Sequence, residues 1–403
     1  MRSLLSTKEQ RQLRLLEILI QKRDWIRLNE LAQTLECTER ILKNDLNELR
    51  TAFPTFKIQS SINGIMLNLD TAASIEDIYI YFLSHSQSFQ LLEYMFFNEG
   101  LPIYRTVEKL HSSNANLYRL GNRITTILSK QFQIELSFTP TSLNGNEIDI
   151  RYFYAQYFSE RYYFLDWPFP DISEKVITEF ADYFYKSTNY PMRFAIYRMY
   201  KLMLAISIHR VKNGHFIDLP NHFYQDYYPV LMNLPDFEDK LAYFSQQFGL
   251  EMTPDIVAQI FISFLQNDIF LDPQQFFDSL NKNDESRYSY QLLSQILERL
   301  SKAFNIKFAN HDELIWHLHN TAYFERQETF STPLLFEQKG ITLEKFKVYF
   351  PDFMESARQE LAQYRQAIGQ HDYPEQLEHL IYTLFTHAEN ITTQLLANRP
   401  PIK

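Results

Sequence analysis

The sequence predicts a mainly α-helical protein, with tandem winged helix-turn-helix domains followed by two all-helical bundles. Residues 28–49 show helical spacing interrupted by one short turn, and an Asn-Gly hairpin signal follows them. A second copy of this pattern lies 75 residues further on, and another helical pattern repeats at an offset of 120 residues in the C-terminal half. These observations predict four domains, at residues 1–70, 71–150, 165–285 and 286–398.

The length and composition are those of a globular protein. A chain of 403 residues is too long for one core at roughly 100–200 residues per domain. Its single cysteine, Cys37, excludes a disulfide framework and a cysteine-based zinc site. The N-terminus lacks the apolar run of a signal peptide, and no stretch is apolar enough to span a bilayer. We therefore expect a cytoplasmic protein with no membrane partner.

The formal charge is distributed unevenly along the chain. The total is -10, yet residues 1–60 hold 11 Lys and Arg against 8 Asp and Glu, and residues 100–130 hold 5 against 1. Residues 151–403 hold 23 against 32. Phosphates respond to charges within a Debye length, about 8–10 Å in physiological salt. The two basic segments are therefore where nucleic acid would bind.

The first basic segment has the pattern of a helix-turn-helix. Two short helices are separated by the tripeptide ECT, and Thr38 is a suitable N-cap for the second helix. The apolar stripe of that helix consists of Ile41, Leu42, Leu46 and Leu49. Basic and amide side chains on the other face suit phosphates and base edges of double-stranded DNA. The candidate DNA contacts are Arg40, Lys43, Asn44 and Asn47.

A predicted β-hairpin completes this module. The stretch FKIQSSINGIMLNL alternates apolar and polar residues, and its Asn63-Gly64 pair is a strong signal for a type I′ turn. Three helices followed by a hairpin make a winged helix. The plainer interpretation is an amphipathic helical hairpin whose polar face is ordinary solvated surface.

The second copy repeats the apolar and capping positions of the first. Thr38 aligns with Ser113, Leu42 with Leu117 and Leu49 with Ile124. A short strand pair around QFQIELSF would be its wing. The candidate DNA contacts of this copy are Asn114, Tyr118, Arg119, Asn122 and Arg123. The alternative is a decayed structural repeat that contacts no DNA.

The C-terminal half contains a different internal repeat. KLAYFSQQFGLEMTPDIVAQIFISFL lies over ELAQYRQAIGQHDYPEQLEHLIYTLF, so that Gly249 matches Gly369 and Pro254 matches Pro374. Each copy is typical of two helices joined by a loop with Gly and Pro. Two homologous all-helical domains are therefore expected.

The chain resembles the Mga/AtxA family of virulence regulators from Gram-positive bacteria. The tandem winged helices, GNEIDIRYFY, ELIWHLHNTAYFER and LIYTLFTHAENI carry this resemblance over essentially the whole sequence. It implies a transcription regulator in which the helical bundles are PTS regulation domains. Such domains take phosphate on histidine from a phosphocarrier of the sugar phosphotransferase system. It also implies a homodimer, although family members usually end in a IIB-like domain that assists oligomerisation, and this sequence stops at LANRPPIK.

The resemblance implies three candidate phosphorylation sites. His319 stands seven residues before Arg326, as in the regulation-domain pattern, and the first repeat has Met203 and Arg210 at the equivalent positions. His387 lies on the later helix of the second repeat, opposite Asn267 in the first, and His209 is a further candidate beside the Met203 position. A phosphoryl group would give a neutral imidazole roughly two negative charges. The plainer interpretation of each is a surface histidine or a packed polar residue.

The sequence gives little support for an enzyme or a metal protein, and it leaves one further class of function open. The sequence contains no glycine-rich phosphate loop, H-E-x-x-H motif or nucleophile elbow, so we expect neither an enzyme nor a cofactor. The cluster His311, Asp312, His317 and His319 has metal-ligand chemistry. However, His317 and His319 point in different directions on a helix, so no metal site is expected. The remaining alternative is an interaction scaffold whose winged helices bind protein rather than DNA.

Overall fold

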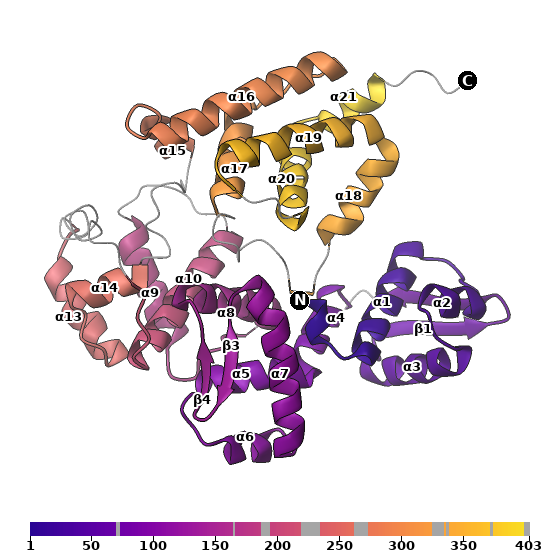
Figure 1. Ribbon diagram of the computed structural model, residues 1–403, viewed down its shortest axis with the longest axis horizontal. Helices are drawn as coiled ribbons and strands as arrows, with labels where there is room; N and C mark the ends of the chain where they lie inside the picture. The colour runs from indigo at the N-terminus through magenta and orange to yellow at the C-terminus, as the bar shows by residue number, and fades with distance from the viewer. Residues whose placement is uncertain are drawn as a thin grey trace. The chain divides into compact units, whose positions relative to one another are not determined.

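The computed structural model is mainly helical, and the predicted fold class is confirmed (Figure 1). It describes residues 1–69, 73–163, 166–186, 194–218, 234–261, 273–324, 334–335, 338–370 and 374–398. These residues form two compact units. The first contains Met1–Gly145 and Tyr157–Pro168, and the second contains Asn146–Gln156 and Phe169–Lys403. Helix α8, Glu147–Tyr162, contributes residues to both units.

The first winged helix begins with a short 3-10 helix, and three α-helices and a hairpin follow. The elements are η1 Arg2–Leu4, α1 Thr7–Lys22, α2 Leu28–Thr34, α3 Glu39–Ala52, β1 Phe56–Ser61 and β2 Gly64–Leu69. The two strands are antiparallel, and an isolated bridge between Ile26 and Ile65 adds a third extended segment. Leu42, Leu46 and Leu49 of α3 are at most 2% exposed, whereas Ile41 is 39% exposed. The prediction that Ile41 belongs to the buried stripe was therefore wrong.

The wing hairpin is confirmed, but its turn lies one residue earlier than predicted. Ser61 pairs with Gly64, so Ile62 and Asn63 occupy the centre of the turn. A type I′ turn needs positive φ at both central residues, and only Gly64 of this group has one, at 125°. Gly64 also meets the Ile26 segment closely, since a Cβ there would lie 2.0 Å from the Ile26 carbonyl oxygen. Glycine is therefore needed at position 64 because the Ile26 segment packs against it, and not because of a type I′ turn.

The second winged helix follows the same order with one additional helix. Its elements are α4 Glu76–His85, α5 Gln87–Phe97, α6 Ile103–Lys109, α7 Asn114–Gln131, β3 Glu135–Phe138 and β4 Thr141–Asn144. The predicted wing stretch contains β3, which pairs with β4 in antiparallel register. Helices α2 and α6 begin and end 75 residues apart, as do the N-termini of α3 and α7. The repeat found in the sequence is therefore a repeat of structure.

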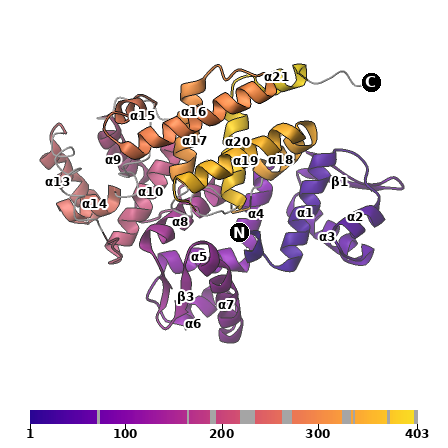
Figure 2. The ribbon, with the colours of Figure 1, turned by 45° about the horizontal axis from the view of Figure 1, so that its top comes forward.

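The second unit is entirely helical in its described residues (Figure 2). After the first residues of α8 come α9 Glu174–Lys186, α10 Phe194–Lys212, α13 Phe237–Phe248, α14 Pro254–Phe261, α15 Pro273–Ser279, α16 Asp284–Phe304, α17 His311–Phe324, α18 Gln338–Tyr349, α19 Pro351–Ala367, α20 Pro374–His387 and α21 Ile391–Ala397. The predicted 120-residue repeat is visible in the backbone. Gly249 and Gly369 both take positive φ, at 59° and 77°, and Pro254 and Pro374 each begin a helix.

Each helical repeat has its own apolar core. In the first, the ring of Phe180 lies 4.8 Å from Phe244, 5.4 Å from Phe248 and 5.5 Å from Phe261, measured between centroids. In the second, helices α16, α17, α19 and α20 contribute a continuous cluster that includes Leu297, Leu318, Leu361 and Leu380. Among the described helices, none combines the length and the apolar character needed to cross a membrane.

A buried ion cluster links the first residues of α8 to α10. Glu147 accepts hydrogen bonds from Nε of Arg151 at 2.9 Å and from Nη2 of Arg210 at 2.7 Å, and both arginine side chains are at most 1% exposed. Arg151 also donates to the carbonyl oxygen of Gln259 at 2.6 Å. Burial alone would raise the pKa of Glu147, but hydrogen bonds and charge from the two arginines outweigh it and lower the pKa. One carboxylate thus compensates two buried guanidinium groups.

We expect Glu147→Gln to destabilise the second unit by about 3–5 kcal/mol, because it leaves two buried cations without their anion. Since the pKa of Glu147 is lowered, its contribution is complete above the ordinary glutamate pKa of about 4.3 and is lost as the pH falls through the folded-state value. Urea unfolding followed by circular dichroism, over a pH series, measures both effects.

The matched control is Glu298→Gln, which breaks an exposed pair with Lys302 on one helix. It should leave the urea midpoint unchanged, because exposed ion pairs contribute little. Equal midpoints for the Glu147 and Glu298 variants would show that the buried cluster does not stabilise the unit.

Candidate nucleic-acid interface

The turn between the two helices has the same backbone geometry in both winged helices. Glu36 and His111, which are 75 residues apart, both take left-handed φ, at 49° and 47°. The amide of Cys37 bonds the carbonyl oxygen of Ala32 at 2.9 Å, and the amide of Ser112 bonds that of Val107 at 3.0 Å. A turn of this kind closes one helix and allows the next to leave at an angle. Both modules are therefore helix-turn-helix structures in their backbone hydrogen bonds as well as in their sequence pattern.

The second helix of each helix-turn-helix, α3 or α7, begins directly after its predicted N-cap residue. The Thr38 hydroxyl accepts from the Ile41 amide at 3.3 Å, and the Ser113 hydroxyl accepts from the Asn116 amide at 3.2 Å. Each cap satisfies one of the free amides of the first helical turn. The N-termini of α3 and α7 are thus set by the same side-chain chemistry.

Two of the three acidic side chains of α3, Asp45 and Glu48, are paired with side chains of α1. Asp45 is 2% exposed and accepts from Nε of Arg11 at 2.6 Å and from Gln12 at 3.3 Å. Glu48 accepts from Lys8 at 2.7 Å and from Gln12 at 2.8 Å. The hydrogen bond to Asp45 raises the pKa of Arg11, and the hydrogen bond from Lys8 lowers the pKa of Glu48. Two negative charges of α3 are therefore neutralised on the side away from its outer face.

The predicted contacts of α3 lie together on that outer face. The four residues are exposed: Arg40, Lys43, Asn44 and Asn47. Within the described part of the chain, Arg40 and Lys43 form no ion pair with an acidic residue. Their charge is therefore available to an external anion. Glu39, at the start of the helix, is also exposed and lowers the positive potential at that end.

Arg50 connects the outer face of α3 to the wing. It donates from Nε to the carbonyl oxygen of Ile58 at 3.0 Å, from Nη2 to the hydroxyl of Ser60 at 2.5 Å and from Nη1 to the side-chain oxygen of Asn47 at 3.1 Å. Arg50 was not among the contacts predicted from the sequence, although a basic residue in the last helical turn before a predicted wing was a usable signal. These bonds place Asn47 and the wing in a fixed relation.

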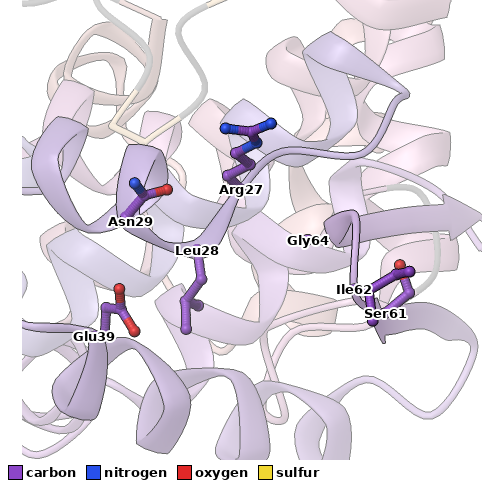
Figure 3. A pocket seen from close by; sticks show the side chains of 7 residues that line it. All are labelled: Arg27, Leu28, Asn29, Glu39, Ser61, Ile62 and Gly64. Atoms are coloured by element: carbon purple, nitrogen blue, oxygen red, sulfur yellow. The ribbon is translucent and has the colours of Figure 1, made fainter.

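Two shallow hollows lie between the helices and the wing. One, of about 370 Å³, is lined by residues of α3 and the wing that include Lys43, Asn47, Arg50 and Ser60. The other, of about 310 Å³, lies beside Gly64. Figure 3 shows Arg27, Leu28 and Asn29 on one side of it and Ser61 and Ile62 of the wing on the other, with Glu39 nearby. The wing and the start of α2 thus frame the outer face of α3.

Helix α7 presents a similar face with no acidic residue in its sequence. Exposed residues on it include Asn114, Tyr118, Arg119 and Asn122. The ring of Tyr118 packs edge-on against Phe138 of the wing, with centroids 5.2 Å apart. Gly121 permits this approach, because a Cβ there would lie 2.3 Å from the Phe138 ring. Arg119 donates to Asn116 of its own helix at 2.8 Å.

Arg123 differs from the other predicted contacts. The residue is exposed overall, but its Nη2 donates to the carbonyl oxygen of Leu4 at 2.8 Å and to the Ser88 hydroxyl at 2.6 Å. These partners lie on η1 and α5. Position on the helix alone suggested a DNA contact, and no sequence signal pointed to the N-terminal segment as its partner.

The three candidate phosphorylation sites have different surroundings. His319 is 0% exposed, its Nδ1 lies 2.8 Å from the Ser289 hydroxyl, and its ring stacks on Tyr323 at a centroid distance of 4.2 Å. His387 is half-buried, and its ring lies 3.9 Å from that of His317. His209 is half-buried, with Nε2 3.2 Å from Asn213. Arg326 and Asn267, used to identify these sites, lie outside the described residues.

The structure also describes Met203 and Arg210, which match the His319 and Arg326 positions, and the His311–Asp312 pair of the weighed metal cluster. Met203 is 1% exposed on α10, seven residues before the buried Arg210. His311 bonds Asp312 at 2.9 Å, and the described residues contain no group of three or more His, Cys, Asp or Glu arranged to hold a metal ion.

Comparison with known proteins identifies the family. Residues 6–65 match the HTH domain of the M protein trans-acting positive regulator, residues 71–158 match the Mga helix-turn-helix domain, and residues 173–391 match the PRD domain of the same regulator. A protein of Streptococcus pneumoniae named as a trans-acting regulator is 39% identical over 404 residues, which cover 100% of this chain and 82% of that protein.

Relatives from Bacillus anthracis are more distant. The capsule synthesis positive regulator AcpB is 21% identical over 88% of this chain and 76% of its own length. The anthrax toxin expression trans-acting positive regulator is 25% identical over 52% of this chain and 44% of its own length. Together with the two helix-turn-helix modules and the helical repeats, these matches show that the chain belongs to the Mga family of trans-acting regulators.

Proposed function

We propose that the chain regulates transcription by binding double-stranded DNA with the outer faces of α3 and α7 and with the adjoining wings. The observation that carries this proposal is the repeated helix-turn-helix geometry, which presents exposed cations beside amide side chains on both helices. Arg40, Lys43 and Arg119 would contact phosphates or guanine, and Asn44, Asn47, Asn114 and Asn122 have the amide groups that read adenine. Tyr118 has a hydroxyl that can donate to a phosphate.

The acidic total charge of the chain does not oppose this proposal. Attraction to a phosphate depends on charges within about 8–10 Å. On α3 the carboxylates of Asp45 and Glu48 are paired with α1, and α7 contains no carboxylate. Residues 151–403 hold 23 Lys and Arg against 32 Asp and Glu, which is most of the acidic excess. Residues 71–150 as a whole hold 5 against 8, but Glu108 is the single acidic residue of the segment 100–130 that contains α6 and most of α7. DNA approaching either outer face would therefore meet a locally positive surface.

We expect Lys43→Ala to weaken binding to a promoter duplex and to reduce the magnitude of the log–log salt slope by about 0.9, because one phosphate contact is lost. Arg40→Ala should act in the same way if it meets a phosphate. If it meets a base, it should relax specificity at one position at a cost of about 1–3 kcal/mol. Fluorescence anisotropy over a salt series measures the affinity and the slope.

Lys22→Ala is the matched control, because Lys22 is exposed on α1 and pairs with Glu30. It should change neither affinity nor slope. If the wild-type chain showed no affinity for duplex DNA over the salt series, the scaffold alternative, in which the winged helices bind protein, would replace this proposal.

We further propose that phosphorylation of histidine in the helical repeats, by a phosphocarrier of the sugar phosphotransferase system, tunes this activity. The PRD match over residues 173–391 supports the proposal. His319 is buried in a polar chain with Ser289 and Tyr364, so the packing around it would respond to added charge. Two added negative charges could not remain in that buried site without rearrangement of the helices around it. A change at His319 would therefore alter the packing of α16, α17 and α19.

We expect His387 to be phosphorylated faster than His319, because its ring is partly exposed and the ring of His319 is not. The measurement is a time course of acid-labile label from a phosphocarrier, mapped by peptide. His387→Gln should remove the fast phase, and His209→Gln should remove any label on α10.

His85→Gln, on the exposed surface of α4, is the control for non-specific labelling and should have no effect. A single phase that maps to His319 would contradict the expected order while leaving the proposed regulation intact. Absence of label on all three histidines would contradict the regulation itself.

The proposal also includes a homodimer, which the family resemblance implies. Light scattering of the full chain measures the oligomeric state.

A further inference from the structure

Hydrogen bonds join the two winged helices of the first unit at the N-terminal segment. Nη2 of Arg123, on α7, lies 2.8 Å from the carbonyl oxygen of Leu4 and 2.6 Å from Oγ of Ser88. The Ser88 hydroxyl, on α5, itself lies 2.6 Å from the same carbonyl oxygen. Leu4 is 0% exposed and Ser88 is 1% exposed. Arg123 and Ser88 of the second module therefore both bond the backbone carbonyl oxygen of Leu4 in the first module, and Leu4 and Ser88 are buried.

Two further contacts join the modules, and a third holds the N-terminal segment to α1. Glu17 of α1 accepts from Nη1 of Arg2 at 2.7 Å and from the Tyr79 hydroxyl of α4 at 2.8 Å. Phe53, which follows α3, lies 4.7 Å from the ring of Tyr81 on α4. Buried hydrogen bonds and ring packing resist relative motion, because breaking them leaves polar groups unsatisfied. The two modules of this unit are thus held together from both α1 and α3.

We propose that Arg123 is a positioning residue that holds α3 and α7 in a fixed relation, so that the two modules read two DNA segments in one helical phase. This inference rests on the DNA binding proposed above. The major groove returns to the same face of the duplex every 10–10.5 base pairs, so a rigid pair of recognition helices requires one spacing and one phase between its two sites. A flexible pair would tolerate small changes in both.

Arg119 provides the comparison, because it lies one helical turn before Arg123 on α7. Its described contact is with Asn116 of its own helix, and it makes none with η1 or α5. Arg119 should therefore contribute to affinity by contacting a phosphate or a base. Arg123 should instead fix the position of α7 relative to the first module. The same substitution at the two positions separates the two roles.

The experiment uses the full chain and a duplex selected from random sequence, in which footprinting has located two protected segments. Insertions of 2 and 5 base pairs are made between them. Wild type should lose at least tenfold in affinity with either insertion, because a rigid pair of helices fixes both the distance and the phase between its two sites. Arg123→Gln should reduce the penalty of the 2-base-pair insertion severalfold and leave the salt slope unchanged. Arg119→Gln should weaken binding to all three duplexes by a similar factor and reduce the slope by about 0.9.

Ser88→Ala removes part of the same junction without changing charge, and it should also reduce the penalty of the 2-base-pair insertion if Arg123→Gln does not fold. Equal wild-type affinity for the three duplexes would overturn the inference but not the proposed DNA binding. A smaller salt slope in Arg123→Gln would show a phosphate contact and would also overturn it. Absence of binding to any duplex would overturn the proposed function and this inference together.

Discussion

The pairing of α3 with α1 is the interaction on which the proposed DNA-binding surface depends. Asp45 and Glu48 would place two negative charges on a helix that must attract phosphate, but Arg11, Gln12 and Lys8 pair with them on the side of the helix next to α1. Asp45 is buried, so loss of its partners would carry a large desolvation cost. The same contacts therefore anchor the helix and separate its charges, and the outer face carries Arg40 and Lys43 against the single exposed carboxylate of Glu39.

Each wing is attached to its recognition helix by a different means. In the first module, Arg50 reaches from α3 to the backbone and hydroxyl groups of β1, and Gly64 allows Ile26 to pair with the second strand. In the second module, Phe138 of β3 packs on Gly121 and Tyr118 of α7. One attachment is polar and directional, and the other depends on close apolar packing. Both place the wing beside the exposed polar face of its helix.

The second unit combines aromatic cores with a few buried polar groups, and these groups lie where regulation is proposed. Glu147, Arg151 and Arg210 form an ion cluster between α8 and α10 of the first repeat. His319 is packed between Phe276 and Tyr323 and linked through Ser289 to Tyr364. A change of charge at such a site has a large effect on packing, because the interior cannot screen it as water does.

The sequence by itself determined the order of the modules, both internal repeats, the caps at Thr38 and Ser113 and the exposed polar faces of α3 and α7. These features depend on residues close together in the chain, where periodicity and capping chemistry act locally. Only the tertiary structure decided that Arg123 contacts Leu4 and Ser88, that Gly64 lies against the Ile26 segment and that His319 is fully buried while His387 is half-buried. Each of these depends on which segments meet after folding, and the same side chain on the same helical face can meet either solvent or a distant part of the chain.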